Sequence, residues 1–151
     1  MQFSNLIAEL LFALSAIAII PAGHSFTCTP TRVWDGDGPI WCAEGPRVRL
    51  AAIGVREIDG SCRRHQPCPA MSGVAAREVL VRLLGGARGV ASTGHIIVRG
   101  PTMACRSRGD GKGNRTAATC TVPGLGDLSC AMVKAKAALP WPAFGGDRVC
   151  R

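Results

Sequence analysis

The sequence predicts a small domain of the α+β class, mainly β, in which a five-stranded OB-fold barrel carries two or three helices and is stapled by disulfide bonds. Short segments rich in β-branched and aromatic residues recur between turn residues, as in small barrels. Two longer segments have apolar residues at helical spacing. Eight cysteines in 151 residues favour a disulfide framework. A layered α/β sheet would instead need strands and helices that alternate along the whole chain.

The first 25 residues have the features of a signal peptide. An unbroken apolar run covers residues 10–20 and has the length of a leader sequence. Gly23 and Ser25 are the small residues that cleavage after Ser25 requires, which leaves residues 26–151 as the domain. The alternative is an uncleaved N-terminal anchor, because no Lys or Arg precedes the run and Glu9 lies at its edge.

Three strands are predicted before the first helix, over residues 27–34, 39–43 and 47–55. The sequence Asp35-Gly36-Asp37-Gly38 joins the first two. Asp-Gly is a strong hairpin signal, because glycine accepts a positive φ and aspartate bonds to its own backbone. A polar loop rich in cysteine and arginine is expected over residues 59–69.

The second half of the domain is predicted to contain two helices and a hairpin. Apolar spacing predicts a helix over residues 70–84, which ends at Gly85-Gly86. Residues 90–98 predict a strand, and residues 115–122 predict its hairpin partner across the polar loop 106–114. The last helix is expected to begin after Asp127, a good N-cap, and to run to about Ala138, because Pro140 prevents its continuation.

All eight cysteines follow the leader, and an even number in a small exported domain predicts four disulfide bonds. The expected location is therefore the bacterial periplasm or the cell exterior. Although about 105 pairings are open, the simplest joins cysteines that are neighbours in the chain. These pairs are Cys28 with Cys42, Cys62 with Cys68, Cys105 with Cys120, and Cys130 with Cys150.

The domain is strongly basic, which predicts an anionic partner. All 18 Lys and Arg residues lie beyond residue 31 and nine of the ten acidic residues lie beyond the leader, so residues 26–151 carry a net charge of +9. Nucleic acid, anionic lipid and acidic polysaccharide all satisfy this charge. The expected state is a monomer without stable membrane association once the leader has been removed.

Charged residues that suit phosphate chemistry lie at the ends of the predicted strands: Asp35, Asp37, Arg49, Glu57 and Arg115. Each alone would ordinarily be a loop or solvent-facing residue. Together they supply what phosphodiester hydrolysis needs, namely a carboxylate for a hard cation, a second to activate water, and arginines for the charge that builds on phosphate. The planar arginine fork can bond two phosphate oxygens at once.

The order of five segments resembles the staphylococcal-nuclease-like (thermonuclease) family. The segments are RVWDGDG, VRLAAIGVRE, a helix rich in Ala and Leu, GDGKGNRTAATC and GLGDLSCAMVKAKAAL, and they span about residues 28–139. The resemblance implies an OB barrel with helices. It also implies an endonuclease that cleaves DNA and RNA with calcium and leaves 3′-phosphate ends.

The resemblance also implies the roles of individual residues. Arg49 and Arg115 match the two phosphate-binding arginines, and Glu57 matches the glutamate that activates water. These three are the expected catalytic residues. Arg56 and Lys112 are expected to contact the nucleic-acid substrate, because each adds a positive charge beside the catalytic set.

The implied calcium site is incomplete in this sequence. Asp37 matches the family's metal-binding aspartate, Asp35 supports it from behind, and the backbone of Val55 is a further expected ligand. Gly54 stands where the family has its second metal-binding carboxylate. Because calcium affinity follows the number and charge of oxygen ligands, this loss weakens the expected site unless Asp59 replaces the missing group.

Two further departures concern the nucleotide pocket and the second helix. The chain has no tyrosine, so stacking on bases would have to come from Trp34, Trp41 or Trp141, residues that more often pack in a core. The family usually has glycine where Lys136 ends the second helix. Lys136 therefore either adopts a left-handed cap, at a cost of about 1 kcal/mol, or lies in a helix that continues to Ala138.

Three functional hypotheses follow. The first is an exported nuclease that hydrolyses DNA or RNA with the help of calcium. The second is a nucleic-acid-binding module that has lost turnover together with the carboxylate at Gly54. The third, which rests only on charge and sulfur, is an exported protein that acts on the cell envelope or on lipid.

Overall fold

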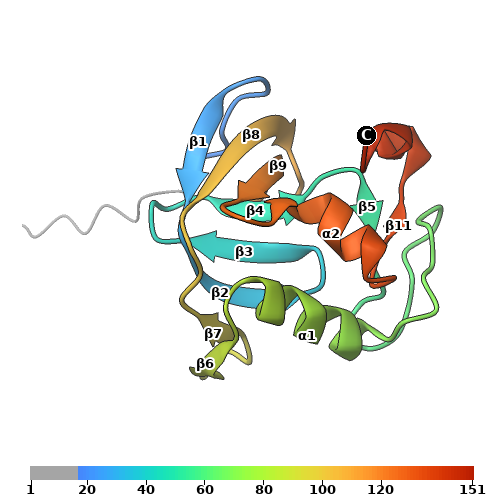
Figure 1. Cartoon of the computed structure of the whole chain (residues 1–151), viewed down its shortest axis with the longest axis horizontal. Coiled ribbons are helices and arrows are strands. Elements are labelled where there is room, and N and C mark those ends of the chain that lie inside the picture. Colours follow the sequence, from blue (N-terminus) through green and yellow to red (C-terminus); the bar gives the residue numbers. More distant parts are fainter. Residues whose placement is uncertain (1–16) are drawn as a thin grey trace, which may run out of the picture.

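The computed structural model describes residues 17–151, so most of the predicted leader lies outside the described residues. The fold is mainly β with two α-helices, as the sequence predicts, and α1 packs on β2 while α2 packs on β9 (Figure 1). The elements are β1 (Ser25–Cys28), β2 (Pro30–Asp35), β3 (Gly38–Cys42), β4 (Arg47–Leu50), β5 (Ile53–Gly54), α1 (Gly73–Leu83), β6 (Ala87–Val90), β7 (Ile96–Val98), β8 (Met103–Asp110), β9 (Thr116–Val122), β10 (Gly126–Asp127), α2 (Leu128–Lys134), β11 (Leu139–Pro140), and the short 3₁₀ turns η1 (Pro142–Phe144) and η2 (Gly146–Arg148).

Most strands belong to one sheet with the order β1-β8-β9-β4-β3-β2-β7-β6, to which β10 adds beside β9. The pairing of β4 with β9 is parallel, and the others in this sheet are antiparallel. Only Thr29 separates β1 from β2, so one bent stretch of chain pairs with β8 and then with β3 and β7. Within residues 17–151 the pairing path does not close, so the closed five-stranded barrel stays a prediction.

Two strand predictions were wrong in the second half of the chain. Residues 90–98 contain the end of β6, a turn and β7 rather than one strand, because Gly94, with φ of 89°, makes a turn in which its N–H donates to the Ala91 carbonyl. The hairpin partner of β9 is β8, which extends to Asp110 through residues predicted as a loop. Met103, Cys105 and Ser107 of β8 are buried while the residues between them are exposed, so its polar composition reflects an outward face of arginines.

The predicted strand 47–55 is divided into β4 and β5. Ala52 lies between them with φ of 68°, a conformation that breaks an extended chain. Two hydrogen bonds from distant residues stabilise this turn: the Ser129 hydroxyl donates to the Ala51 carbonyl at 2.9 Å, and the Trp141 N–H donates to the Ala52 carbonyl at 2.8 Å. Both donors come from the C-terminal part of the chain, which the local sequence pattern does not contain.

Both helices begin at side-chain caps. The Ser72 hydroxyl accepts from the Ala75 N–H before α1, and Asp127, as predicted, accepts from the Cys130 N–H before α2. The extension of α2 to Ala138 was wrong: Lys136 takes the left-handed conformation with φ of 60°, the alternative that the sequence left open. No helix within residues 17–151 is long and apolar enough to cross a bilayer.

All four disulfide pairs join neighbouring cysteines, as predicted: Cys28–Cys42, Cys62–Cys68, Cys105–Cys120 and Cys130–Cys150. The first and third bridges lie in the apolar core, which also contains Ile40, Leu50, Leu80 and Met132. In so small a domain the bridges add to a modest core, and each contributes about 2–4 kcal/mol when unstrained. Four bridges indicate an oxidising compartment such as the periplasm or the cell exterior.

Residues 20–24 are hydrogen-bonded to Ser107 of β8 and Thr116 of β9. The Ile20 N–H donates to Thr116 Oγ1 at 3.0 Å, and the Ser107 hydroxyl donates to the Ile20 carbonyl at 2.6 Å. The backbone of Ser107 exchanges two further bonds of 2.9 Å with Gly23 and His24. Because Ser107 and Thr116 are buried, cleavage after Ser25 would remove partners from two buried hydroxyl groups.

This contact predicts that a chain beginning at Phe26 is less stable than one beginning at Ile17. The expected loss in free energy of unfolding is about 1–3 kcal/mol, because water replaces part of the lost bonding. Urea unfolding of the two oxidised proteins at one pH measures it. Equal midpoints and slopes would contradict the prediction and would mean that residues 17–25 contribute nothing to the domain.

Candidate functional site

The two aspartates of the Asp-Gly-Asp-Gly sequence lie in the turn between β2 and β3 and are both buried, at 4% and 5% exposure. The Asp37 N–H donates to Asp35 Oδ1 at 3.2 Å, which is the local bond expected of a hairpin aspartate. A Cβ on Gly36 would lie 2.8 Å from the Cβ of Ala76, so only glycine lets α1 pack this close. The hydrogen bond of Asp35 and the close packing of Gly36 on α1 therefore explain the turn, and its burial brings two carboxyl groups next to α1.

Burial, followed by the neighbouring charges of Asp37 and Glu57, raises the pKa of Asp35 to about 9. At neutral pH Asp35 is therefore protonated and carries no charge. The influence of Glu57 on this pKa places the glutamate in the same region as the two aspartates, although three strands separate it from them in the sequence.

Arg49 forms an ion pair with Asp37. Its Nη2 lies 3.3 Å from Asp37 Oδ2, and both side chains are largely shielded from water. The guanidinium carbon of Arg49 also lies 5.5 Å from the ring centre of Trp141, which allows a cation–π contact. Arg49 is thus held by an acid on one side and an aromatic ring on the other.

Arg115 lies next to this ion pair and is half-buried. Its Nε donates to the Lys112 carbonyl at 2.8 Å and its Nη2 donates to the Gly111 carbonyl at 3.2 Å. Burial and then the positive charge of Arg49 lower the pKa of Arg115 below its usual value, while Asp37 acts in the opposite direction. The two arginines expected to bind phosphate therefore face one region, because β4 and β9 run side by side in parallel.

Glu57 completes the predicted set but has a partner that the sequence did not indicate. Its Oε1 accepts from Arg63 Nε at 3.1 Å, in the loop closed by Cys62–Cys68. A Cβ on Gly73 would overlap the Glu57 carbonyl, so the first turn of α1 fixes the backbone at Glu57. The second carboxylate oxygen of Glu57 has no partner among the described residues.

The two residues expected to contact substrate are placed differently. Arg56 donates to the Pro69 carbonyl at 2.7 Å and to the Gly60 carbonyl at 2.9 Å, so its guanidinium ties the loop 59–69 together. Lys112 is exposed and has φ of 65°. It lines an open cavity of about 410 Å³ together with Arg49, Arg108 and Phe144. Of Arg56 and Lys112, only Lys112 lines the cavity that contains Arg49.

The donors around Asp37 do not fit a calcium ion, although the resemblance implies one. Asp37 is paired with Arg49, and Gly54 offers no side chain. The Val55 carbonyl already accepts a 2.7 Å bond from Gln66 Nε2. Asp59 does not replace the missing carboxylate, because it is exposed and accepts both bonds of Ser61 in its own loop. Calcium takes six to eight oxygen ligands, more than these residues offer.

Gln66 occupies the space next to Gly54. A Cβ at position 54 would lie 3.0 Å from both Cγ and Nε2 of Gln66. Gln66 is buried, and its Oε1 has no hydrogen-bond partner among the described residues. The glycine at position 54 is therefore matched to a glutamine that fills its missing side-chain volume.

Several residues of this region could not be found from sequence patterns: Arg63, Gln66, Arg108 and Phe144. The cysteine-flanked segment CRRHQPC was the one available signal for the first two. Of the three tryptophans, Trp141 lies against Arg49, whereas Trp34 and Trp41 both pack on His95. Trp141 and its neighbour Phe144 are therefore the aromatic residues nearest to Arg49 among these contacts.

The raised pKa of Asp35 predicts a distinct pH dependence of stability. The folded state binds more protons than the unfolded state between pH 3.8 and about 9, so this residue stabilises the fold at low pH and loses that effect as pH rises. Asp35→Asn should therefore gain stability relative to wild type from pH 5 to pH 8, by up to about 1.4 kcal/mol per pH unit. Urea unfolding at several pH values tests this, and parallel profiles would refute it.

The contact of Gly54 with Gln66 predicts an energetic coupling. Gly54→Ala should cost about 1–3 kcal/mol, because the added methyl overlaps the amide. The same substitution should cost less in a Gln66→Ala background, where that space is open. A double-mutant cycle by urea unfolding measures the difference, and an equal cost in both backgrounds would show that Gln66 does not set the identity of residue 54.

A comparison of the chain with protein-family models, with curated proteins and with solved structures finds no match. The resemblance to the thermonuclease family therefore rests on the five segments alone, and the family's properties stay predictions for this protein.

Proposed function

We propose that this protein is an exported phosphodiesterase that hydrolyses DNA or RNA and leaves 3′-phosphate ends. The observation that carries the proposal is the ion pair of Arg49 with the buried Asp37, in a region where Arg115 interacts electrostatically with both residues and Glu57 with Asp35. With Asp35 protonated, the arginines Arg49, Arg63 and Arg115 outweigh the ionised acids of this region. An anionic phosphodiester balances that excess of positive charge.

The residues then take the following roles. Arg49 and Arg115 bind the non-bridging oxygens and offset the charge that builds on phosphorus. Asp37 orients Arg49 through their ion pair. The free oxygen of Glu57 accepts the proton of the attacking water, while Arg63 holds the other oxygen. The P–O5′ bond breaks, the O5′ oxygen takes up a proton from solvent, and the phosphate stays on the 3′ end.

The fold supports the proposal at the level of architecture. The strands β2, β3, β4, β9 and β8 are neighbours in one sheet, and β1 runs on from β2 to pair with β8. This arrangement suits a partly open five-stranded barrel of the OB type, a fold that binds nucleic acid on its strands and loops. The proposal also retains export to an oxidising compartment and a monomeric state.

A second candidate is a nucleic-acid-binding module without turnover. It is favoured because groups of the site already have hydrogen-bond partners within the protein. The Val55 carbonyl accepts from Gln66, and Arg115 donates to two backbone carbonyls. Such a module would bind nucleic acid in a salt-sensitive manner and release no product. An envelope-binding protein, the third hypothesis, would instead prefer anionic lipid vesicles.

Cleavage of labelled single-stranded DNA and RNA by the oxidised protein tests these alternatives, with calcium and with a chelator as separate arms. Glu57→Gln and Arg49→Gln are each expected to reduce the rate by about 10²-fold or more. Glu78→Gln is the matched control, because Glu78 is an exposed carboxylate on α1 with no contact to the site. Equal rates in the calcium and chelator arms would agree with the poor fit of the donors to calcium.

The outcomes separate the hypotheses. Cleavage that Glu57→Gln does not slow would refute the assigned mechanism. Binding without cleavage in every metal arm would establish the module instead. Preference for vesicles with anionic lipid over nucleic acid would favour the envelope hypothesis. New ends that a polymerase extends only after phosphatase treatment would identify the expected 3′-phosphate product.

A further inference from the structure

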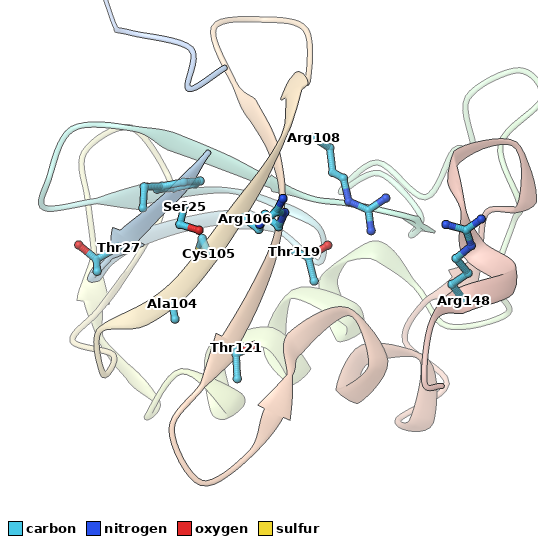
Figure 2. Close-up of a pocket in the computed structure, with 10 residues that line it drawn as sticks. Ser25, Thr27, Ala104, Cys105, Arg106, Arg108, Thr119, Thr121 and Arg148 are labelled. Carbon is cyan, nitrogen blue, oxygen red and sulfur yellow. The ribbon is translucent and has the colours of Figure 1, made fainter. Parts of the chain in front are cut away.

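An arginine-lined groove lies on the outer face of β1, β8 and β9, away from the carboxylates of the candidate site. It has a volume of about 720 Å³ and is open to solvent. Figure 2 shows Arg106 beside Thr119, with Arg108 and Arg148 turned toward the space between β8 and the C-terminal segment. We call this surface the arginine groove and define it by Arg106, Arg108 and Arg148.

The strand register explains why polar groups gather on its floor. Ser25, Arg106 and Thr119 lie opposite one another across β1, β8 and β9. The next outward-facing row contains Thr27, Ala104 and Thr121. Residues paired across antiparallel strands project from the same face, so each row presents hydroxyl groups next to the small or cationic residue of β8.

A β-bulge places Arg108 at the end of the groove. The register of β8 with β9 shifts between Ser107 and Gly109, which leaves Arg108 as the extra residue of its strand. Its guanidinium approaches the C-terminal segment, since a Cβ on Gly145 would lie 3.6 Å from Arg108 Nη1. The Cys130–Cys150 bridge holds that segment, including Arg148, against α2.

The groove arginines have no carboxylate partner. Within residues 17–151 the ion pairs are those of Arg49 with Asp37 and of Arg63 with Glu57. Four acids lie around the groove, and three of them accept hydrogen bonds: Glu44 from Thr29, Asp110 from the Lys112 N–H, and Asp127 from the Cys130 N–H, while Asp147 is exposed beside Arg148. The positive charge of the groove is therefore available to a ligand.

Arg108 connects this groove to the candidate site. It lines the arginine groove, and it also lines the cavity that contains Arg49, Lys112 and Phe144. A smaller depression lined by Ala51, Thr119 and Arg148 lies between the two and includes Arg108 as well. The hollows from Arg49 to Arg106 thus share lining residues, and arginines outnumber the two acids that also line them, Asp110 and Asp127.

We propose that the arginine groove binds the backbone of single-stranded nucleic acid, as the continuation of the strand whose reacting phosphate lies at Arg49 and Arg115. The identity of the ligand rests on the proposed function. Arg106 and Arg108 lie two residues apart on β8 and both line the groove, so they can contact neighbouring phosphates of one strand. The threonine hydroxyls donate to the same oxygens. Because Arg108 lines both the arginine groove and the cavity at Arg49, one strand can extend from the candidate site into the groove.

Binding of labelled single-stranded DNA of about 4 and about 16 nucleotides tests the proposal, measured by fluorescence anisotropy across a salt series. All proteins carry Glu57→Gln so that the strand stays intact. The test variant is Arg106→Gln with Arg148→Gln. The matched control is Arg82→Gln with Arg99→Gln, two exposed arginines outside the groove with the same change in charge.

The test variant is expected to lose at least about tenfold in affinity for the long strand at low salt, and its salt slope should fall by about 1.4, the value for two lost phosphate contacts. The loss should be smaller for the short strand. Equal losses in the test and control variants, or equal losses for both strand lengths, would overturn the proposal, because they indicate general charge attraction.

Cleavage and vesicle-binding measurements distinguish a failure of the groove proposal from a failure of the proposed hydrolase function. Cleavage by the protein with an intact Glu57, together with no selective loss in the test variant, would refute the groove alone. Selective loss of long-strand binding in a protein that never cleaves would refute the hydrolase and support the groove. Stronger loss of binding to vesicles containing phosphatidylserine than to DNA would overturn the proposal in favour of a lipid ligand.

Discussion

The parallel pairing of β4 with β9 is the constraint on which the candidate site depends. It sets Val48, Arg49 and Leu50 beside Thr116, Ala117 and Ala118, two segments that are distant in the chain. The Ala51 N–H extends the contact by donating to the Ala118 carbonyl. Because this pairing closes a long loop, it must be held by burial on both sides, and Val48, Leu50 and Ala118 are all fully buried. Arg49 and Arg115 meet only because these strands do.

The charge of the site depends on the acids and arginines that lie near the pairing of β4 with β9. Gly36 lets the Asp35–Asp37 turn pack on Ala76 of α1, and Gly73, the first residue of α1, lets the helix pack on the Glu57 carbonyl. Burial keeps Asp35 protonated, so Asp37 and Glu57 pair with Arg49 and Arg63 while the charge of Arg115 has no carboxylate partner among the described residues. A region that is rich in donors and short of anions suits a phosphate ligand. It suits a divalent cation less well, since Asp37 already forms an ion pair with Arg49 and the Val55 carbonyl already accepts a hydrogen bond from Gln66.

The disulfide bonds hold the segments that carry candidate function, in addition to the core. Cys62–Cys68 closes the loop that contains Arg63 and Gln66. Cys105–Cys120 joins directly opposed residues of β8 and β9, beneath the floor of the arginine groove. Cys130–Cys150 fixes the C-terminal segment, from which Arg148 projects. Loops with few apolar residues cannot be ordered by packing alone, so covalent closure supplies the order that side-chain recognition needs.

The sequence by itself determined those features that depend on neighbouring residues: the Asp-Gly turn, the Asp127 cap of the second helix, the mainly β composition and four bridges between adjacent cysteines. It also identified five charged residues that the fold brings together. Only the tertiary structure decided the partner of β9, because the arginine-bearing outer face of β8 has the composition of a loop. The pairing of Arg63 with Glu57, the filling of Gly54 by Gln66 and the protonation of Asp35 were likewise decided there. Each depends on burial and on contacts between distant segments, and no local pattern encodes either.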